Sequence, residues 1–112
     1  RDVDDSRESP SKKIIEEVVK RGGKIKVYDP YVKKIYTDAG KFISEKDVET
    51  AVIDSDCAIF VTDHTVFRRL DLKEIAKKMR HPVIIDCRNI FKHVNSRGVV
   101  YLGIGKNNEA EE

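Results

Sequence analysis

The sequence lacks three features that would each indicate a particular class of protein: a long apolar run, a large net charge and closely spaced cysteines. No apolar run approaches the ~20 residues that a helix needs to cross a bilayer, and the charged start, residues 1–10, is not a signal peptide. The net charge is only +2, from 22 basic and 20 acidic residues, whereas a general nucleic-acid binder usually has a basic excess. We therefore expect neither a membrane nor a nucleic acid among the partners.

The two cysteines, Cys57 and Cys87, each lie beside strand-like sequence. They form neither a Cys-x-x-Cys pair nor a Cys/His set with metal-ligand spacing, so no metal site is predicted. Their number allows a disulfide, but two buried thiols in a reducing cytosol are the favoured interpretation. The protein is therefore expected in the cytoplasm.

The rest of the composition is that of one globular domain with a modest core, because 39% of the 112 residues are hydrophobic and 38% are charged. Ser9 and Pro10 are a good helix start, and the apolar spacing that follows predicts a helix over residues 10–21. Residues 31–44 are expected to form a short helical turn and an irregular segment. Further helices are expected at residues 44–55 and 71–79, and strands at residues 24–28, 57–61, 83–85 and 99–102. The polar tail, residues 106–112, is expected to be disordered.

Strands that alternate with helices favour a mainly parallel sheet with right-handed crossovers. The predicted fold class is therefore α/β, a Rossmann-like three-layer domain over residues 1–105. Strand 57–61 is almost wholly apolar, as expected of a strand covered on both faces. A domain of this kind normally begins with a strand, whereas this chain begins with a polar loop, so its first strand is expected to be missing from the chain. Buried backbone groups left unpaired there would cost ~1–3 kcal/mol each, so we expect an upstream segment, another chain or a changed strand order to fill the gap.

Polar segments follow two of the expected strands, at residues 62–65 and 86–89. Ligands of parallel sheets bind beyond the carboxyl ends of the strands, so function is expected in these segments and in the segment before the first helix. Asp86 is expected to be structural, accepting hydrogen bonds from loop amides. His64 invites a catalytic interpretation, but a turn histidine that caps the next helix is favoured.

Several segments together resemble the UDP-glucose/GDP-mannose dehydrogenase family over residues 4–105. The most specific is Asp4-Asp5-Ser6-Arg7-Glu8-Ser9-Pro10, which resembles the family's D-D-x-R-E-S-P signature. Weaker matches in the same order are Val27-Tyr28-Asp29-Pro30, Pro82-Val83-Ile84-Ile85-Asp86-Cys87-Arg88-Asn89 and Tyr101-Leu102-Gly103-Ile104-Gly105. The second of these resembles the family's P-V-V-x-D-G-R-N segment, with Cys87 where glycine is usual, which puts the local backbone conformation in question.

The resemblance implies a nucleotide-sugar-binding C-terminal domain of an NAD-dependent dehydrogenase that oxidises the sugar C6 alcohol to a carboxylate. In that family NAD is held mainly by an N-terminal domain, and the intact enzyme is a homodimer or a higher homo-oligomer. The resemblance implies that Arg7 faces the cofactor's phosphates and that Arg88 contacts the UDP-sugar. Neither the family's glycine fingerprint nor its catalytic cysteine is present here, so no catalytic residue is assigned and the chain alone is expected to be inactive.

Two further segments, Thr62-Asp63-His64 with Phe67 and Arg88-Asn89-Ile90-Phe91, resemble the family members that act on UDP-N-acetylmannosamine. UDP-glucose enzymes often carry tryptophan near position 64, so a UDP-N-acetylhexosamine substrate is predicted. Two alternatives stay open: a receiver-like signalling domain and a stand-alone nucleotide-binding module. A receiver needs a phosphoacceptor aspartate and a Lys-Pro dipeptide; Asp63 is a poor candidate for the first, and the second is absent.

Overall fold

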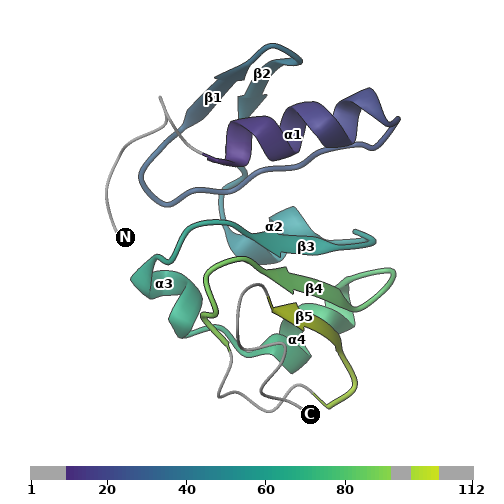
Figure 1. Ribbon diagram of the computed structural model, residues 1–112. Coiled ribbons are helices and arrows are strands. Elements are labelled where there is room, and N and C mark those ends of the chain that lie inside the picture. The colour runs from purple at the N-terminus through teal and green to yellow at the C-terminus, as the bar shows by residue number, and fades with distance from the viewer. Residues whose placement is uncertain (1–9, 92–96, 104–112) are drawn as a thin grey trace. The chain divides into compact units, whose positions relative to one another are not determined.

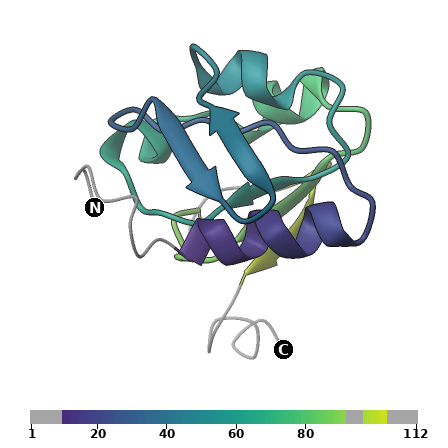
Figure 2. The ribbon, with the colours of Figure 1, turned by 90° about the horizontal axis from the view of Figure 1, so that it is seen from above.

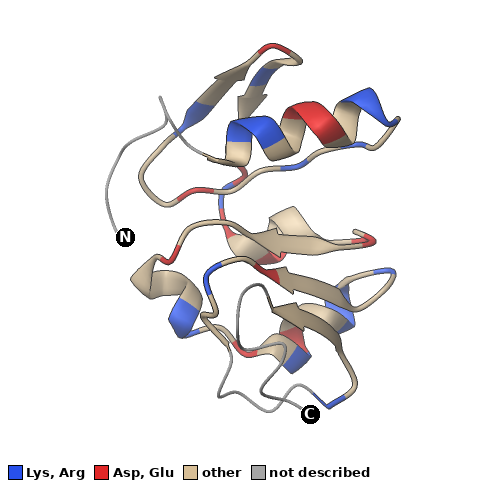
Figure 3. Cartoon of the chain, in the orientation of Figure 1, with Lys and Arg blue, Asp and Glu red and all other residues tan. Residues whose placement is uncertain are grey.

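The computed structural model describes residues 10–91 and 97–103. The chain divides into two compact units, one ending at Ala51 and the other starting at Val52. We call the described parts of these the N-unit, residues 10–51, and the C-unit, residues 52–91 and 97–103. Figure 3 shows basic and acidic residues interspersed along both units, as the nearly balanced charge predicts.

The N-unit consists of helix α1 (Pro10–Lys20) and a hairpin of strands β1 (Lys34–Thr37) and β2 (Gly40–Ile43), seen from above in Figure 2. Its core joins the helix to the hairpin through Ile15, Val32 and Ile35, with Val19, Ile25, Val27 and Phe42 packed around them. The helix confirms the prediction for residues 10–21. It ends where the Gly22 and Gly23 amides donate to the carbonyls of Val19 and Val18, with Gly22 at a φ of 91°, a left-handed helix end that glycine favours.

The hairpin corrects the prediction of an irregular segment for residues 31–44. The two strands pair antiparallel, with Ile35 opposite Phe42 and Tyr36 opposite Lys41. Ile35 is buried while Lys34 and Tyr36 are exposed, so the short segment does carry the alternation of a half-buried strand. Its two-residue turn is closed by a hydrogen bond from the Thr37 hydroxyl to the Gly40 carbonyl.

Two further predictions in the N-unit are wrong in extent. Within residues 24–28 only Val27 takes part in strand pairing, in an isolated parallel bridge to Ser44. Because Ser44 is held by that bridge, it cannot start the next helix. Helix α2 (Val48–Val52) instead begins after Asp47, whose carboxylate accepts a hydrogen bond from the Thr50 amide at 2.7 Å.

The C-unit contains a parallel sheet of strands β3 (Ala58–Phe60), β4 (Val83–Asp86) and β5 (Val100–Gly103), in the order β3-β4-β5 (Figure 1). Two helices, α3 (Thr65–Arg68) and α4 (Leu72–Lys78), connect β3 to β4. The α4 helix starts after Asp71, whose side chain accepts a hydrogen bond from the Lys73 amide. The buried hydrophobic residues of this unit are Val52, Ala58, Phe60, Phe67, Leu72, Ile75, Met79, Ile84 and Phe91. The α/β class and the parallel sheet are therefore confirmed.

The two faces of this sheet differ in burial. Phe60, Ile84 and Asp86 are buried, whereas Ile59 and Leu102 are 37% and 51% exposed. The expectation that strand 57–61 is covered on both faces is therefore wrong for Ile59. Among the described residues β3 pairs with β4 alone.

Two expectations concern segments outside the described residues. The predicted disordered tail, residues 106–112, lies outside the described residues, as does the whole D-D-x-R-E-S segment before α1. Among the residues that are described, no helix has the length and apolar character to cross a membrane.

Candidate functional site

The candidate site is formed by two loops that leave the carboxyl ends of neighbouring parallel strands, β3 and β4 (Figure 1). We call residues 61–64 the β3 loop and residues 87–91 the β4 loop. The start of the β4 loop is tied to β3, because the Cys87 amide donates a hydrogen bond of 2.9 Å to the Phe60 carbonyl. This is the edge of a parallel sheet where ligands bind in α/β proteins, and it lies within the C-unit.

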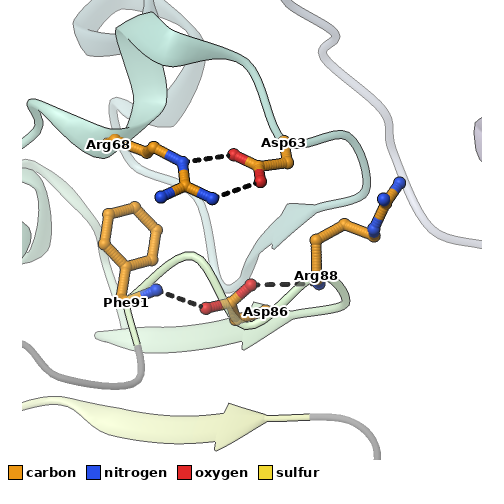
Figure 4. Close-up of polar contacts among 5 residues, drawn as sticks. All are labelled: Asp63, Arg68, Asp86, Arg88 and Phe91. Carbon is orange, nitrogen blue, oxygen red and sulfur yellow. Dashed lines mark hydrogen bonds and ion pairs between the residues drawn. The ribbon is translucent and has the colours of Figure 1, made fainter. Parts of the chain in front are cut away.

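Asp86 organises the β4 loop from its base. Its side chain is fully buried. Oδ1 accepts a hydrogen bond from the Arg88 amide at 3.1 Å, and Oδ2 accepts one from the Phe91 amide at 2.8 Å (Figure 4). The loop turns between these two amides at Asn89, which has a left-handed φ of 57°. The prediction that Asp86 bonds loop amides is confirmed.

A third hydrogen bond to Asp86 comes from β5. The Tyr101 hydroxyl lies 2.6 Å from Oδ2, the length of a hydrogen bond to a charged oxygen. A buried carboxylate is costly unless donors compensate it, and here three donors do so. Asp86 is therefore a structural anchor.

Arg88 is exposed, and its side chain extends away from the Asp86 carboxylate (Figure 4). Its backbone amide is bonded to Asp86, while its guanidinium has no ion pair or hydrogen bond with any residue that the structure describes. A guanidinium keeps its charge at all physiological pH values and can grip phosphate oxygens with two parallel hydrogen bonds. Arg88 therefore offers a positive charge at the carboxyl end of the sheet.

The other arginine near this edge, Arg68, is engaged differently. Its Nε lies 2.7 Å from Oδ1 of Asp63, and its Nη2 bonds Oδ2, so the two side chains form a bidentate ion pair (Figure 4). The Asp63 side chain is only 9% exposed, whereas that of Arg68 is 46% exposed. This pair neutralises the buried carboxylate and fixes the β3 loop to α3. Asp63, the poor phosphoacceptor candidate of the receiver-like alternative, is thus paired with an arginine.

His64 occupies the N-cap position of α3 but its side chain makes no capping hydrogen bond. The ring is 1% exposed and meets Phe67 edge-on, with ring centroids 5.4 Å apart. The predicted position is therefore confirmed, whereas capping by the side chain is wrong. The ring packs as part of the core instead, since the backbone at this turn places it toward Phe67.

Both cysteines are free and partly buried. Burial raises the pKa of Cys57, and burial together with the nearby negative charge of Asp86 raises the pKa of Cys87. Both thiols therefore stay protonated at neutral pH, which disfavours nucleophilic chemistry at either one. The prediction of two reduced thiols agrees with this arrangement.

Two partners in this site were not identified in the sequence. The sequence pattern places Tyr101 only within the last strand, and it does not indicate Arg68 as the partner of Asp63. Arg7, the other predicted site residue, lies outside the described residues. The structure thus groups Arg88 with Asp86 and Tyr101, and leaves the prediction for Arg7 untested.

A parallel sheet whose loops present an arginine beyond the strand ends defines an α/β domain suited to binding an anionic ligand. Residues 1–93 match the UDP binding domain of the UDP-glucose/GDP-mannose dehydrogenase family, and the chain belongs to this family. It is 36% identical over 104 residues to the UDP-N-acetyl-D-mannosamine dehydrogenase of Pyrococcus horikoshii, covering 93% of this chain and 22% of that protein. The Methanococcus vannielii enzyme of the same name is 36% identical over 95 residues, covering 81% of this chain and 21% of that protein.

Solved structures agree with this assignment. The structure of the UDP-D-ManNAc dehydrogenase from Pyrococcus horikoshii matches with a TM-score of 0.78 and 33% identity, over 93% of this chain and 22% of that one. The chain therefore spans about a fifth of the length of the relatives that it matches. The membership of this family disfavours the receiver-like alternative.

Proposed function

We propose that this chain is the UDP-sugar-binding domain of an NAD-dependent nucleotide-sugar 6-dehydrogenase. The reaction would oxidise the sugar C6 alcohol to a carboxylate, and the substrate would be UDP-N-acetylmannosamine. The family membership supports this proposal. So do the matches to relatives that bear the name UDP-N-acetyl-D-mannosamine dehydrogenase.

The observation that carries the proposal is the contrast between the fixed backbone and the exposed guanidinium of Arg88. Its backbone is held by a buried carboxylate, while its guanidinium is exposed and without an acidic partner among the described residues. A UDP-sugar carries a diphosphate, and a positioned guanidinium can donate two hydrogen bonds to such an anion. Arg68 is a weaker candidate for this role because Asp63 already holds its guanidinium.

NAD would be held mainly by parts of the enzyme outside this chain. The sequence has no Gly-x-Gly-x-x-Gly segment, the loop that binds a dinucleotide's pyrophosphate. We assign Arg7 to the cofactor's phosphates, on the strength of the D-D-x-R-E-S-P resemblance alone. The intact enzyme would act in the cytoplasm as a homodimer or a higher homo-oligomer, and its remaining domains would complete the active site.

The test is steady-state kinetics of the intact enzyme with Arg88→Ala. Loss of one charge-assisted contact, ~1.5–3 kcal/mol, should raise KM for the UDP-sugar by about 10- to 150-fold. Arg80→Ala is the matched control, because Arg80 precedes β4 at its opposite end and is exposed, with Asp56 as its ion-pair partner. An unchanged KM for Arg88→Ala would count against the assignment. Turnover of UDP-glucose but not of UDP-N-acetylmannosamine would refute the proposed substrate.

A further inference from the structure

The hydrogen bond between Tyr101 and Asp86 joins two elements that are distant in the sequence. In the sheet register, Asp86 lies opposite Gly103 and Ile84 lies opposite Tyr101. Ile84 and Asp86 are two residues apart in β4, so their side chains lie on the same face of the sheet. Because Tyr101 is the neighbour of Ile84 in β5, its side chain lies on that face too. Gly103 places no side chain between Tyr101 and Asp86, and the hydroxyl reaches Oδ2 of the carboxylate at 2.6 Å.

Oδ2 of Asp86 also accepts a hydrogen bond from the Phe91 amide, and Oδ1 accepts one from the Arg88 amide. The orientation of the carboxylate therefore fixes both ends of the turn that carries Arg88. Among the residues that the structure describes, the Tyr101 hydroxyl is the one side-chain donor to this carboxylate. Because Asp86 is 0% exposed, water cannot readily replace that donor if it is removed.

We propose that Tyr101 is a positioning residue for nucleotide-sugar binding: its hydroxyl orients the Asp86 carboxylate, which in turn sets the β4 loop and the direction of Arg88. This rests on the proposed role of Arg88. Tyr101 makes no contact with the ligand in this account. Its effect on affinity passes through Arg88, and a change of about 1 Å in the placement of a binding group can cost a large part of its contribution.

The experiment is a double-mutant cycle in the intact enzyme, with Tyr101→Phe, Arg88→Ala and both together. The dissociation constant of UDP is measured by isothermal titration calorimetry, and thermal unfolding is recorded for each variant. Tyr101→Phe should weaken UDP binding about ten-fold in the parent enzyme, the factor that corresponds to ~1.4 kcal/mol. In the Arg88→Ala background it should weaken binding less than about two-fold, because the group through which it acts is gone.

A matched control is Tyr36→Phe, since Tyr36 lies in β1 and is 61% exposed. It should leave UDP affinity unchanged. Thermal unfolding separates an effect of Tyr101→Phe on stability from its effect on UDP binding. The lost hydrogen bond should lower the melting temperature equally in the parent and Arg88→Ala backgrounds, whereas UDP affinity should fall clearly only in the parent. If Tyr101→Phe does not fold, Tyr101→Leu takes its place in the same cycle, because leucine also lacks the hydroxyl that bonds Asp86.

The outcomes are distinguishable. An Arg88→Ala enzyme with normal UDP affinity would show that the proposed role of Arg88 is wrong. A normal affinity for Tyr101→Phe, beside a weakened Arg88→Ala, would overturn the positioning role alone. Equal weakening by Tyr101→Phe in both backgrounds would also overturn it, because Tyr101 would then act on the domain as a whole and not through Arg88.

Discussion

Replacing Asp86 by asparagine tests whether the buried carboxylate holds the β4 loop. The carboxylate accepts one hydrogen bond at Oδ1 and two at Oδ2. An asparagine side chain has only one acceptor oxygen, and its amino group is a donor. With the oxygen in the place of Oδ2, the amino group faces the Arg88 amide. In the reverse orientation it faces the Phe91 amide and the Tyr101 hydroxyl. At least one donor, either the partly buried Arg88 amide or the buried Phe91 amide, therefore loses its acceptor in each case.

An unpaired buried donor costs ~1–3 kcal/mol, and the remaining hydrogen bonds lose their charge assistance. Removing a buried negative charge relieves its desolvation, but three donors already compensate Asp86, so we expect the unpaired donor to dominate. The free energy of unfolding should fall by ~1–3 kcal/mol, which in a chain of this size corresponds to a loss of about 4 °C or more in melting temperature.

The assay is thermal unfolding followed by circular dichroism, with Asp54→Asn as the control. Asp54 is exposed and has a left-handed φ of 59°, a conformation that asparagine tolerates. The control should therefore change stability by less than ~0.5 kcal/mol. An Asp86→Asn protein whose unfolding matches that of the control would refute the anchoring role of Asp86.

Two other predictions concern the cysteines and α4. Burial and the charge of Asp86 raise the pKa of Cys87 above its ordinary value of 9.0, so iodoacetamide should alkylate it at pH 7 more slowly than it alkylates glutathione; equal rates would contradict this. Since the folded pKa is the higher one, the stability that the protonated thiol contributes is present below pH 9 and should be lost as the pH rises through the raised pKa. Asp71→Ala removes the hydrogen bond that caps α4. It should lower the free energy of unfolding, measured by urea denaturation, by ~0.5–2 kcal/mol. An unchanged urea midpoint would show that the cap does not contribute to stability.

The elements that the sequence predicts well are those with long or strongly apolar patterns. The helix at Pro10–Lys20 has three turns of apolar spacing and a glycine end, and the strands of the C-unit are short apolar runs between polar turns. The β1–β2 hairpin was missed because each strand has only four residues, too few for alternation to stand out. Ser44 has the side chain of a helix cap, but pairing with Val27 determines its conformation, and that pairing depends on tertiary structure.

In the candidate site, too, some features could be predicted from the sequence and others depend on the tertiary structure. The hydrogen bonds from loop amides to Asp86 could be predicted, because a carboxylate at the end of a buried strand needs donors and the loop amides are the nearest ones. Its bond to Tyr101 could not, since it depends on the register that sets Tyr101 opposite Ile84. The pairing of Asp63 with Arg68 depends likewise on the path of the loop into α3, which local sequence does not determine.

Hydrogen–deuterium exchange of the intact enzyme, with and without UDP, tests the central claim most directly. If this domain binds the nucleotide-sugar through the β4 loop, UDP should slow exchange in peptides that contain residues 87–91, and Arg88→Ala should abolish that protection at the same UDP concentration. Peptides that contain α1 serve as an internal reference. Protection by UDP elsewhere in the enzyme, with exchange at residues 87–91 unchanged, would contradict the account.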